Sequence, residues 1–142
     1  MIIRGCFVGD APHFDARLRF DHAEGPVRFL ADTGASRTTI MDHDARILGV
    51  SYEDLEAAPG HMVGIGGSIR SFVARNVEII LEADSGRFSL QQDLAIAQHD
   101  LTQLRPEEAA WILRIPSVLS RDFLNRFRFT CDYQAGIVQL ER

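Results

Sequence analysis

Apolar and polar residues alternate along much of the chain, and this alternation predicts β-strands. Between His13 and Phe20 every second residue, beginning with Phe14, is apolar, which is the period of a half-buried strand. A turn over 22–25 separates this segment from a second strand over 27–31. Further strands are predicted over 38–41, 71–82 and 87–97, followed by a strand and a short helix within 116–127 and a closing hairpin over 127–141.

The remaining regular segments are short helices and one glycine-rich hairpin. A helix is predicted between Asp42, as its N-cap, and Gly49, at which it ends. A second helix is predicted to begin near Pro106, because proline suits the first helical position. The glycines of 59–70 favour a mobile hairpin. Together these elements predict a mostly-β fold, a barrel or a sandwich, which occupies residues 1–142 as a single domain.

Charge and cysteine content narrow the classes of function. The formal net charge of −5 argues against a surface for nucleic acid or for an anionic membrane. No apolar run approaches the roughly 20 residues that span a bilayer, and the first ten residues do not form a secretory signal, so a cytoplasmic protein is expected. Cys6 and Cys131 give neither a disulfide framework nor a metal-ligand spacing. We expect buried, reduced thiols, with a bridge between the two as the alternative.

The segment 29–40, FLADTGASRTTI, contains the most informative chemistry. Its apolar strand ends in Asp32, where a carboxylate is costly unless it is hydrogen-bonded, paired or used in a reaction. Taken alone, Asp-Thr-Gly also fits an ordinary turn. Two later segments favour catalysis: the glycine-rich MVGIGG at 62–67, and SVLSRDFL at 117–124, where an apolar strand leads through a small residue to Arg-Asp and a helix.

With these three motifs the chain resembles the retroviral-type (retropepsin-like) aspartic proteases, from about Phe14 to Leu140. The resemblance implies a closed acid-protease barrel with a flap hairpin and a short C-terminal helix. It differs from the family at Ser120, where glycine is usual, and at Ser36, where many viral members carry a second aspartate. The residues that the resemblance assigns to the site are Asp32, Thr33 and Gly34 for catalysis, Ala35, Ser36, Val63, Gly64, Ile65, Gly66 and Gly67 for substrate binding, and Arg121 and Asp122 for structural support.

The number of Asp-Thr-Gly motifs predicts how an active site is completed. Hydrolysis by carboxylates needs an acid and a base that face the same water. This chain has one Asp-Thr-Gly and no second copy. We therefore expect a homodimer in which Asp32 of each subunit lies at the twofold axis. The expected substrate is an extended peptide held as an added strand, with no metal, no other cofactor, no nucleic acid and no membrane.

Two other functions remain open on the sequence. A retropepsin-fold module that dimerises or binds peptides without cleaving them needs the same barrel but no ionisable group at Asp32. A metal-dependent hydrolase needs a ligand cluster, for which Asp42-His43-Asp44 is the candidate. Capping of a helix start explains this triplet better than metal binding does.

Overall fold

The structure is a computed structural model of the 142-residue chain. It describes the backbone of residues 1–64 and 67–142, and the side chains of 1–59 and 69–142. The strands are β1 (Ile2–Arg4), β2 (Cys6–Val8), β3 (Ala11–Phe20), β4 (Ala23–Ala31), β5 (Thr39–Ile40), β6 (Glu56–Gly64), β7 (Gly67–Ala83), β8 (Gly86–His99), β9 (Ser117–Leu119), β10 (Arg128–Asp132) and β11 (Ile137–Glu141). The helices are α1 (Asp42–Leu48), the 3-10 turn η1 (Tyr52–Asp54), α2 (Pro106–Ile112) and α3 (Arg121–Leu124).

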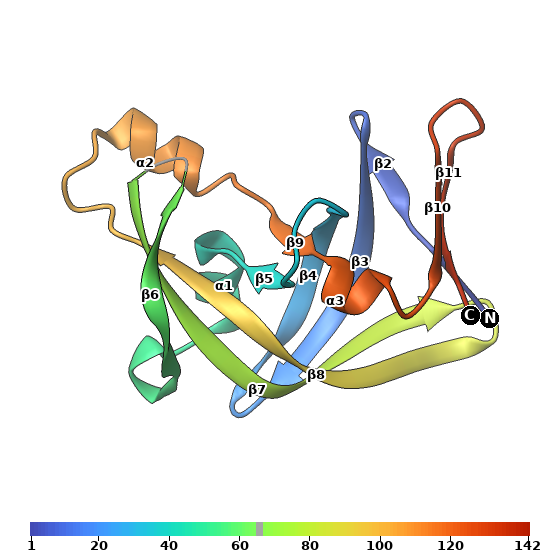
Figure 1. Ribbon diagram of the computed structural model, residues 1–142, viewed down its shortest axis with the longest axis horizontal. Coiled ribbons are helices and arrows are strands. Elements are labelled where there is room, and N and C mark those ends of the chain that lie inside the picture. The colour runs from blue at the N-terminus through green and yellow to red at the C-terminus, as the bar shows by residue number, and fades with distance from the viewer. Residues whose placement is uncertain (65–66) are drawn as a thin grey trace.

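A closed circuit of strand pairs forms the barrel at the centre of the molecule (Figure 1). Strand β3 pairs with β4 and with β7, β7 pairs with β8, and β8 pairs with the short β5. Strand β9 closes the circuit because it pairs with both β5 and β4. The β4–β9 and β5–β8 pairs are parallel, and the other pairs of the circuit are antiparallel. The predicted mostly-β barrel is confirmed.

The alternation in β3 and β4 places their apolar side chains in the core. Phe14, Leu18 and Phe29 are fully buried, whereas the residues next to each of them, such as Asp15, Arg17 and Arg28, face outward. The predicted turn over 22–25 is wrong in its bounds, because β4 begins at Ala23 and the chain reverses at Asp21 and His22. Asp21 has a φ of 47°, a left-handed conformation that short polar side chains tolerate.

Strands β7 and β8 form the long hairpin that curves across the barrel in Figure 1. Strand β7 has 17 residues, starts before the predicted 71–82, and pairs along its length with β6, β8, β3 and β1. A register shift between Ala74 and Val77 bulges this strand, and Asn76 there has a φ of 52°. Such bulges increase local bending and twist, and the bend allows one strand, β7, to pair within the barrel and also within the β6–β7 hairpin.

The two ends of the chain lie side by side in an outer sheet (Figure 1). Strand β11 lies between β1 and β10, and β10 and β2 stand at the two ends of the strand order. The expectation of buried thiols is wrong, since Cys6 and Cys131 are both exposed. Both are also free. The N–H of Gly5, the residue before Cys6, donates to the Val138 carbonyl oxygen of β11, and Val138 pairs on its other side with Cys131 of β10. Two interstrand spacings of about 4.8 Å each therefore separate the backbone next to Cys6 from that of Cys131.

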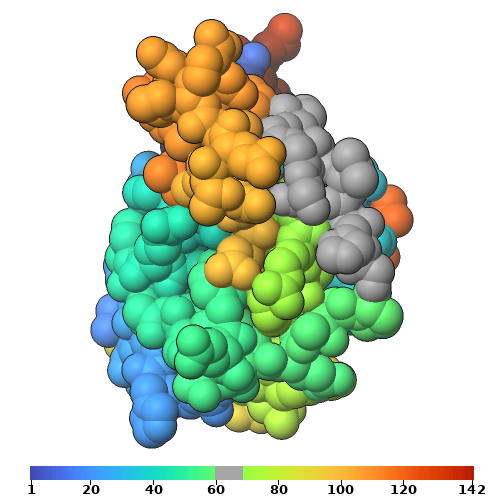
Figure 2. Space-filling view, turned by 90° about the vertical axis from the view of Figure 1, so that its left-hand side faces the viewer, coloured from blue at the N-terminus to red at the C-terminus, as the bar shows by residue number. Residues whose placement is uncertain are grey.

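Helices α1 and α2 lie on the same side of the barrel (Figure 1). Helix α1 ends as predicted, because Gly49 adopts a φ of 74° and its N–H bonds back to the helix. The predicted N-cap is wrong, since Met41 occupies that position and Asp42 is the first helical residue. Helix α2 begins at Pro106 as predicted. Figure 2 shows that α1 and the segment 100–116 occupy one face together. Within the described residues, no helix is long and apolar enough to cross a membrane.

Candidate active site

The loop that carries Asp32 begins at the end of β4 and is called here the Asp32 loop (residues 32–38). The Asp32 backbone N–H donates to the carbonyl oxygen of Leu119 on β9, at 3.0 Å. The Gly34 N–H donates to Asp32 Oδ1 at 2.9 Å, so one carboxylate oxygen is held by the loop itself. Asp32 is half-buried, whereas Thr33 and Gly34 are exposed. The carboxylate is therefore fixed in position and still open to solvent.

Helix α3 binds the tip of the Asp32 loop from the other side. The Arg121 backbone N–H donates to the Ala35 carbonyl oxygen at 3.1 Å. The Arg121 guanidinium lies 3.2 Å from the Thr33 carbonyl oxygen and 3.4 Å from that of Gly34. The structure thus brings Arg121 together with Thr33, Gly34 and Ala35, four residues that the sequence assigned to one site from segments about 85 positions apart.

The end of the Asp32 loop is held by a polar cluster around Asp122. Both Asp122 oxygens lie 3.0 Å from the Thr38 N–H, and Thr38 Oγ1 donates to Asp122 Oδ1 at 2.6 Å. The same Thr38 oxygen accepts from the Ser120 N–H at 3.0 Å. Gln92 of β8 adds a longer contact of 3.4 Å to Asp122. Asp122 was predicted as a support residue, but Thr38 and Gln92 were missed.

Ser120 and Ser36 are the two positions at which the sequence differs from the pattern that it resembles. Ser120 has a φ of −110°, which any residue adopts, so glycine is not required there. Its side chain is fully buried, and its Oγ finds no hydrogen-bond partner within the described part of the chain. Ser36 is exposed on the Asp32 loop. The serine at 120 is therefore compatible with the backbone and costs one unsatisfied hydroxyl.

The glycine-rich segment forms the predicted hairpin as far as the structure describes it. Strand β6 pairs with β7 from His61 opposite Arg70 to Gly64 opposite Gly67, with Val63 opposite Ser68. The two candidates for the hairpin tip, Ile65 and Gly66, lie outside the described residues. Strand β6 is the outer strand here, paired to β7 and off the main strand path.

A buried cluster between α1 and β8 was not predicted. Asp42 and His99 are both buried, and the Asp42 carboxylate accepts from the His99 backbone N–H at 2.7 Å and contacts its ring nitrogen. The Tyr52 hydroxyl lies 3.3 Å from Asp42, and burial together with this carboxylate raises the pKa of Tyr52. Asp44 meanwhile accepts from the Ser117 hydroxyl at 2.6 Å. Both carboxylates of the proposed metal triplet are thus engaged inside the protein.

Residues 17–103 match a family model described as aspartyl protease. The chain belongs to the aspartyl protease family. The matched residues include the whole Asp32 loop and the β6–β7 hairpin, while Arg121 and Asp122 lie beyond them. A comparison of this aspartyl protease with curated proteins gave no match.

Two solved structures share the fold of this aspartyl protease. One is a retropepsin-like aspartic protease from Rickettsia conorii, 18% identical with a TM-score of 0.55, and the match covers 99% of this chain and 88% of that one. The other is EIAV protease complexed with the inhibitor HBY-793, 14% identical with a TM-score of 0.51, covering 84% of this chain and 89% of that one. At these identities the likeness shows the fold alone, and it confirms the retropepsin-like barrel.

Proposed function

We propose that this aspartyl protease is an endopeptidase whose active site forms when two copies of the chain place Asp32 on a twofold axis. The observation that carries the proposal is that the Asp32 loop is held by hydrogen bonds in a single chain while Asp32 stays partly exposed. It is fixed by the Gly34 N–H and by the bond from its own N–H to Leu119, yet it remains only half-buried. A carboxylate held in this way is suited to a reaction at a surface that a second subunit covers.

Two carboxylates are needed because one must act as base while the other acts as acid. When two such groups lie about 3 Å apart they cannot both ionise, so the pair shares a proton. In the proposed reaction the ionised Asp32 removes a proton from a bound water, and that water attacks the peptide carbonyl. The protonated Asp32 of the other subunit donates to the developing oxyanion, and a proton then passes to the leaving amine. The reaction needs no acyl-enzyme, because water is the nucleophile.

The remaining loop residues have roles that their exposure supports. Thr33 and Gly34 are exposed in the single chain, as an axis contact requires before a second copy binds. Gly34 lacks a side chain, so substrate backbone is able to approach Asp32 closely, while Ala35 and Ser36 extend the same surface. The bonds from Arg121 to Thr33 and Gly34 support this loop from within the subunit.

The proposed substrate is an extended peptide that pairs with main-chain groups near Asp32. The β6–β7 hairpin is proposed to close over it as a flap and exclude water. The contacts assigned to the flap come from Val63, Gly64, Ile65, Gly66 and Gly67. Antiparallel pairing of β6 with β7 up to Gly64 and Gly67 supports this assignment.

Cleavage of unfolded protein tests the activity. The wild type is incubated with a denatured protein between acid and neutral pH, with pepstatin, with a chelator, and without either. We expect cleavage that pepstatin inhibits, that the chelator leaves unchanged, and that Asp32→Asn abolishes. Asp10→Asn, at the exposed turn between β2 and β3, is the matched control and should cleave normally. Chelator sensitivity would instead favour a metal hydrolase, and cleavage retained by Asp32→Asn would exclude this residue from the reaction.

Subunit mixing separates a shared active site from one built within a chain. Wild type is allowed to exchange with an equal amount of Asp32→Asn, and activity per wild-type subunit is measured. Random pairing leaves about one quarter of the dimers with two aspartates, so activity is expected to fall to about half that of wild type alone. Unchanged activity would show that each chain acts alone. The expected mass in solution is that of a dimer.

A further inference from the structure

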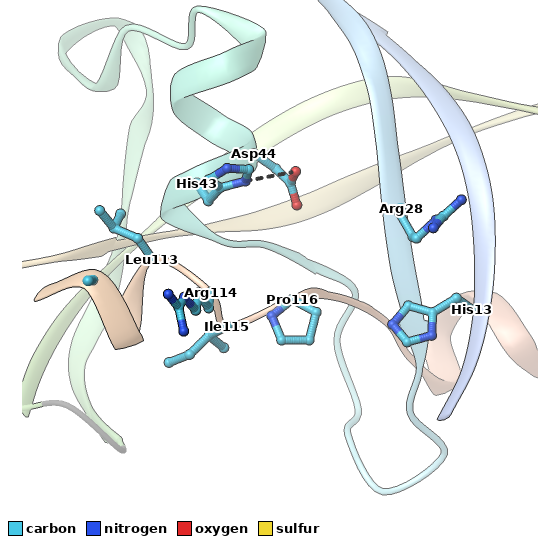
Figure 3. A pocket seen from close by; sticks show the side chains of 9 residues that line it. His13, Arg28, His43, Asp44, Leu113, Arg114, Ile115 and Pro116 are labelled. Carbon is cyan, nitrogen blue, oxygen red and sulfur yellow. Dashed lines mark ion pairs between the residues drawn. The ribbon is translucent and has the colours of Figure 1, made fainter. Parts of the chain in front are cut away.

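A pocket of about 530 Å³ lies beside the strand that leads to Asp32 (Figure 3). One wall consists of His13 and Arg28, which project from the neighbouring strands β3 and β4. The opposite wall is the chain that follows α2, including Arg114. His43 and Asp44 of α1 complete the rim. The apolar part of the lining is Ala110, Leu113, Ile115 and Pro116.

The pocket opens on the same face of β4 as the Asp32 carboxylate. Val27, Phe29 and Ala31 face the core, so Arg28 and Leu30 lie on the opposite side of β4. The same alternation, continued one residue past the end of the strand, puts Asp32 on that side. Four residues of strand separate Arg28 from Asp32, which corresponds to about 13 Å. An extended peptide has the same rise per residue. For a peptide that runs alongside β4, a side chain about four residues from the bond cut at Asp32 therefore comes opposite the pocket.

The second wall is tied to the same site through β9. Pro116 lies directly before β9, and β9 pairs in parallel with β4 from Phe29 to Ala31. Leu119, at the end of β9, accepts the hydrogen bond from the Asp32 N–H. The pocket and Asp32 are therefore linked through the same pair of strands, β4 and β9.

Of the two arginines that line the pocket, Arg28 is paired, whereas Arg114 has no ion pair among the described side chains. Arg28 directs two of its nitrogens to Asp15, at 2.6 and 3.0 Å. Asp44 is the acidic residue of the rim, and its carboxylate accepts from the Ser117 hydroxyl at 2.6 Å and lies 3.7 Å from a His43 ring nitrogen. Arg114 makes no ion pair with any residue whose side chain the structure describes. Its guanidinium thus faces an apolar-floored pocket with its donors available for a carboxylate.

From this arrangement we propose that the pocket binds a glutamate side chain of an extended peptide, about four residues from the scissile bond. The two methylenes of glutamate pack on Leu113, Ile115 and Pro116, and its carboxylate accepts hydrogen bonds from Arg114. Aspartate has one methylene fewer to pack on these residues. The inference rests on the proposed function, because it takes the cut at Asp32 as its reference point.

Cleavage-site profiling tests the preference. Wild type cuts a library of peptides from a digested proteome, and mass spectrometry identifies the residues around each cut. Glutamate should be enriched about five- to tenfold at one position about four residues from the cut. Arg114→Gln should remove this enrichment, and Arg114→Glu should replace it with lysine or arginine. Arg87→Gln is the matched control, since Arg87 is equally exposed and pairs with Glu82 on the β7–β8 hairpin.

A binding measurement separates failure of the pocket from failure of the catalytic proposal. Asp32→Asn is titrated with two labelled peptides that differ only by glutamate or glutamine at the position that profiling selects. If the wild type cleaves nothing, a set of peptides with glutamate at each position in turn is titrated instead. The glutamate peptide should bind about five- to tenfold more tightly, and added Arg114→Gln should equalise the two. Selective binding of the glutamate peptide by Asp32→Asn, together with no cleavage by the wild type, would keep the pocket and overturn the endopeptidase. Cleavage with the same profile in Arg114→Gln, or equal binding of both peptides, would overturn the pocket.

Discussion

Removal of one hydroxyl, that of Thr38, is expected to destabilise the protein strongly. Thr38 is fully buried, and its Oγ1 donates to Asp122 and accepts from the Ser120 N–H. Valine has nearly the shape of threonine but makes neither bond, so Thr38→Val isolates the polar contribution. The change leaves Asp122 with the Thr38 backbone N–H as a donor, but it leaves the Ser120 N–H without its acceptor.

The expected loss follows from the two bonds. A hydrogen bond to a charged group contributes about 1.5–3 kcal/mol, and a buried N–H left without an acceptor costs about 1–3 kcal/mol. The free energy of unfolding should therefore fall by about 4 kcal/mol, out of a total of roughly 5–15 kcal/mol for a domain of this kind. With a urea m-value of about 2 kcal/mol/M, the unfolding midpoint should fall by about 2 M.

The assay is urea unfolding followed by far-UV circular dichroism at one fixed protein concentration, because the proposed dimerisation would make stability depend on concentration. Thr38→Ser is the control, since it keeps the hydroxyl and loses one methyl group, at a cost of about 1 kcal/mol. Valine must therefore be the more damaging of the two substitutions. Equal midpoints for both variants, or a more stable valine variant, would refute the assigned role of the hydroxyl.

Three further predictions concern single sites. Gly5→Ala should lower the unfolding free energy by about 3 kcal/mol in the same urea assay, because the new Cβ would lie 2.4 Å from a backbone carbonyl oxygen. Gly34→Ala should lower kcat/KM about 10- to 100-fold with little change in the urea midpoint, since its Cβ would lie 3.1 Å from Asp32 Oδ1. Bonds from the Asn76 N–H and a neighbouring guanidinium hold the pKa of Asp93 below its ordinary 3.8. The stabilisation by Asp93 is thus present above pH 3.8 and lost as pH falls through the lowered value, so stability of Asp93→Asn, measured against pH, should decline less steeply below about pH 4.

Alternation predicted the barrel strands well because it reports directly on which face of a strand is buried. The pattern in β3 and β4 states which side chains enter the core, and the structure confirms it. The pattern contains no information about partners. Strand β9 joins β4 across more than 80 positions, and β5 reaches β8 across more than 50, so the closure of the barrel was available only through resemblance to a family.

The polar links were beyond sequence reasoning for a related reason. Asp42 sits where a helix begins, and a local rule made it the N-cap. In the structure its carboxylate binds His99 instead, a residue 57 positions away. The β-branched side chain of Thr38 predicts a strand, but the strand begins at its neighbour Thr39. Strand propensity does not predict which groups the Thr38 hydroxyl bonds to. Local propensity describes the backbone, whereas the choice of a hydrogen-bond partner is made by the fold.

These links also explain why the Asp32 loop can be both open and rigid. Its first residue is bonded to β9, its middle to Arg121 and its last to Asp122, so these anchors all come from the same chain. No anchor from a second chain is needed for the loop to hold its shape, and Thr33 and Gly34 stay exposed. A loop that depended on its partner for shape would bind it with a cost in ordering. Anchoring within the chain removes that cost, and it favours a proposed dimer whose two Asp32 loops have their final shape before the subunits meet.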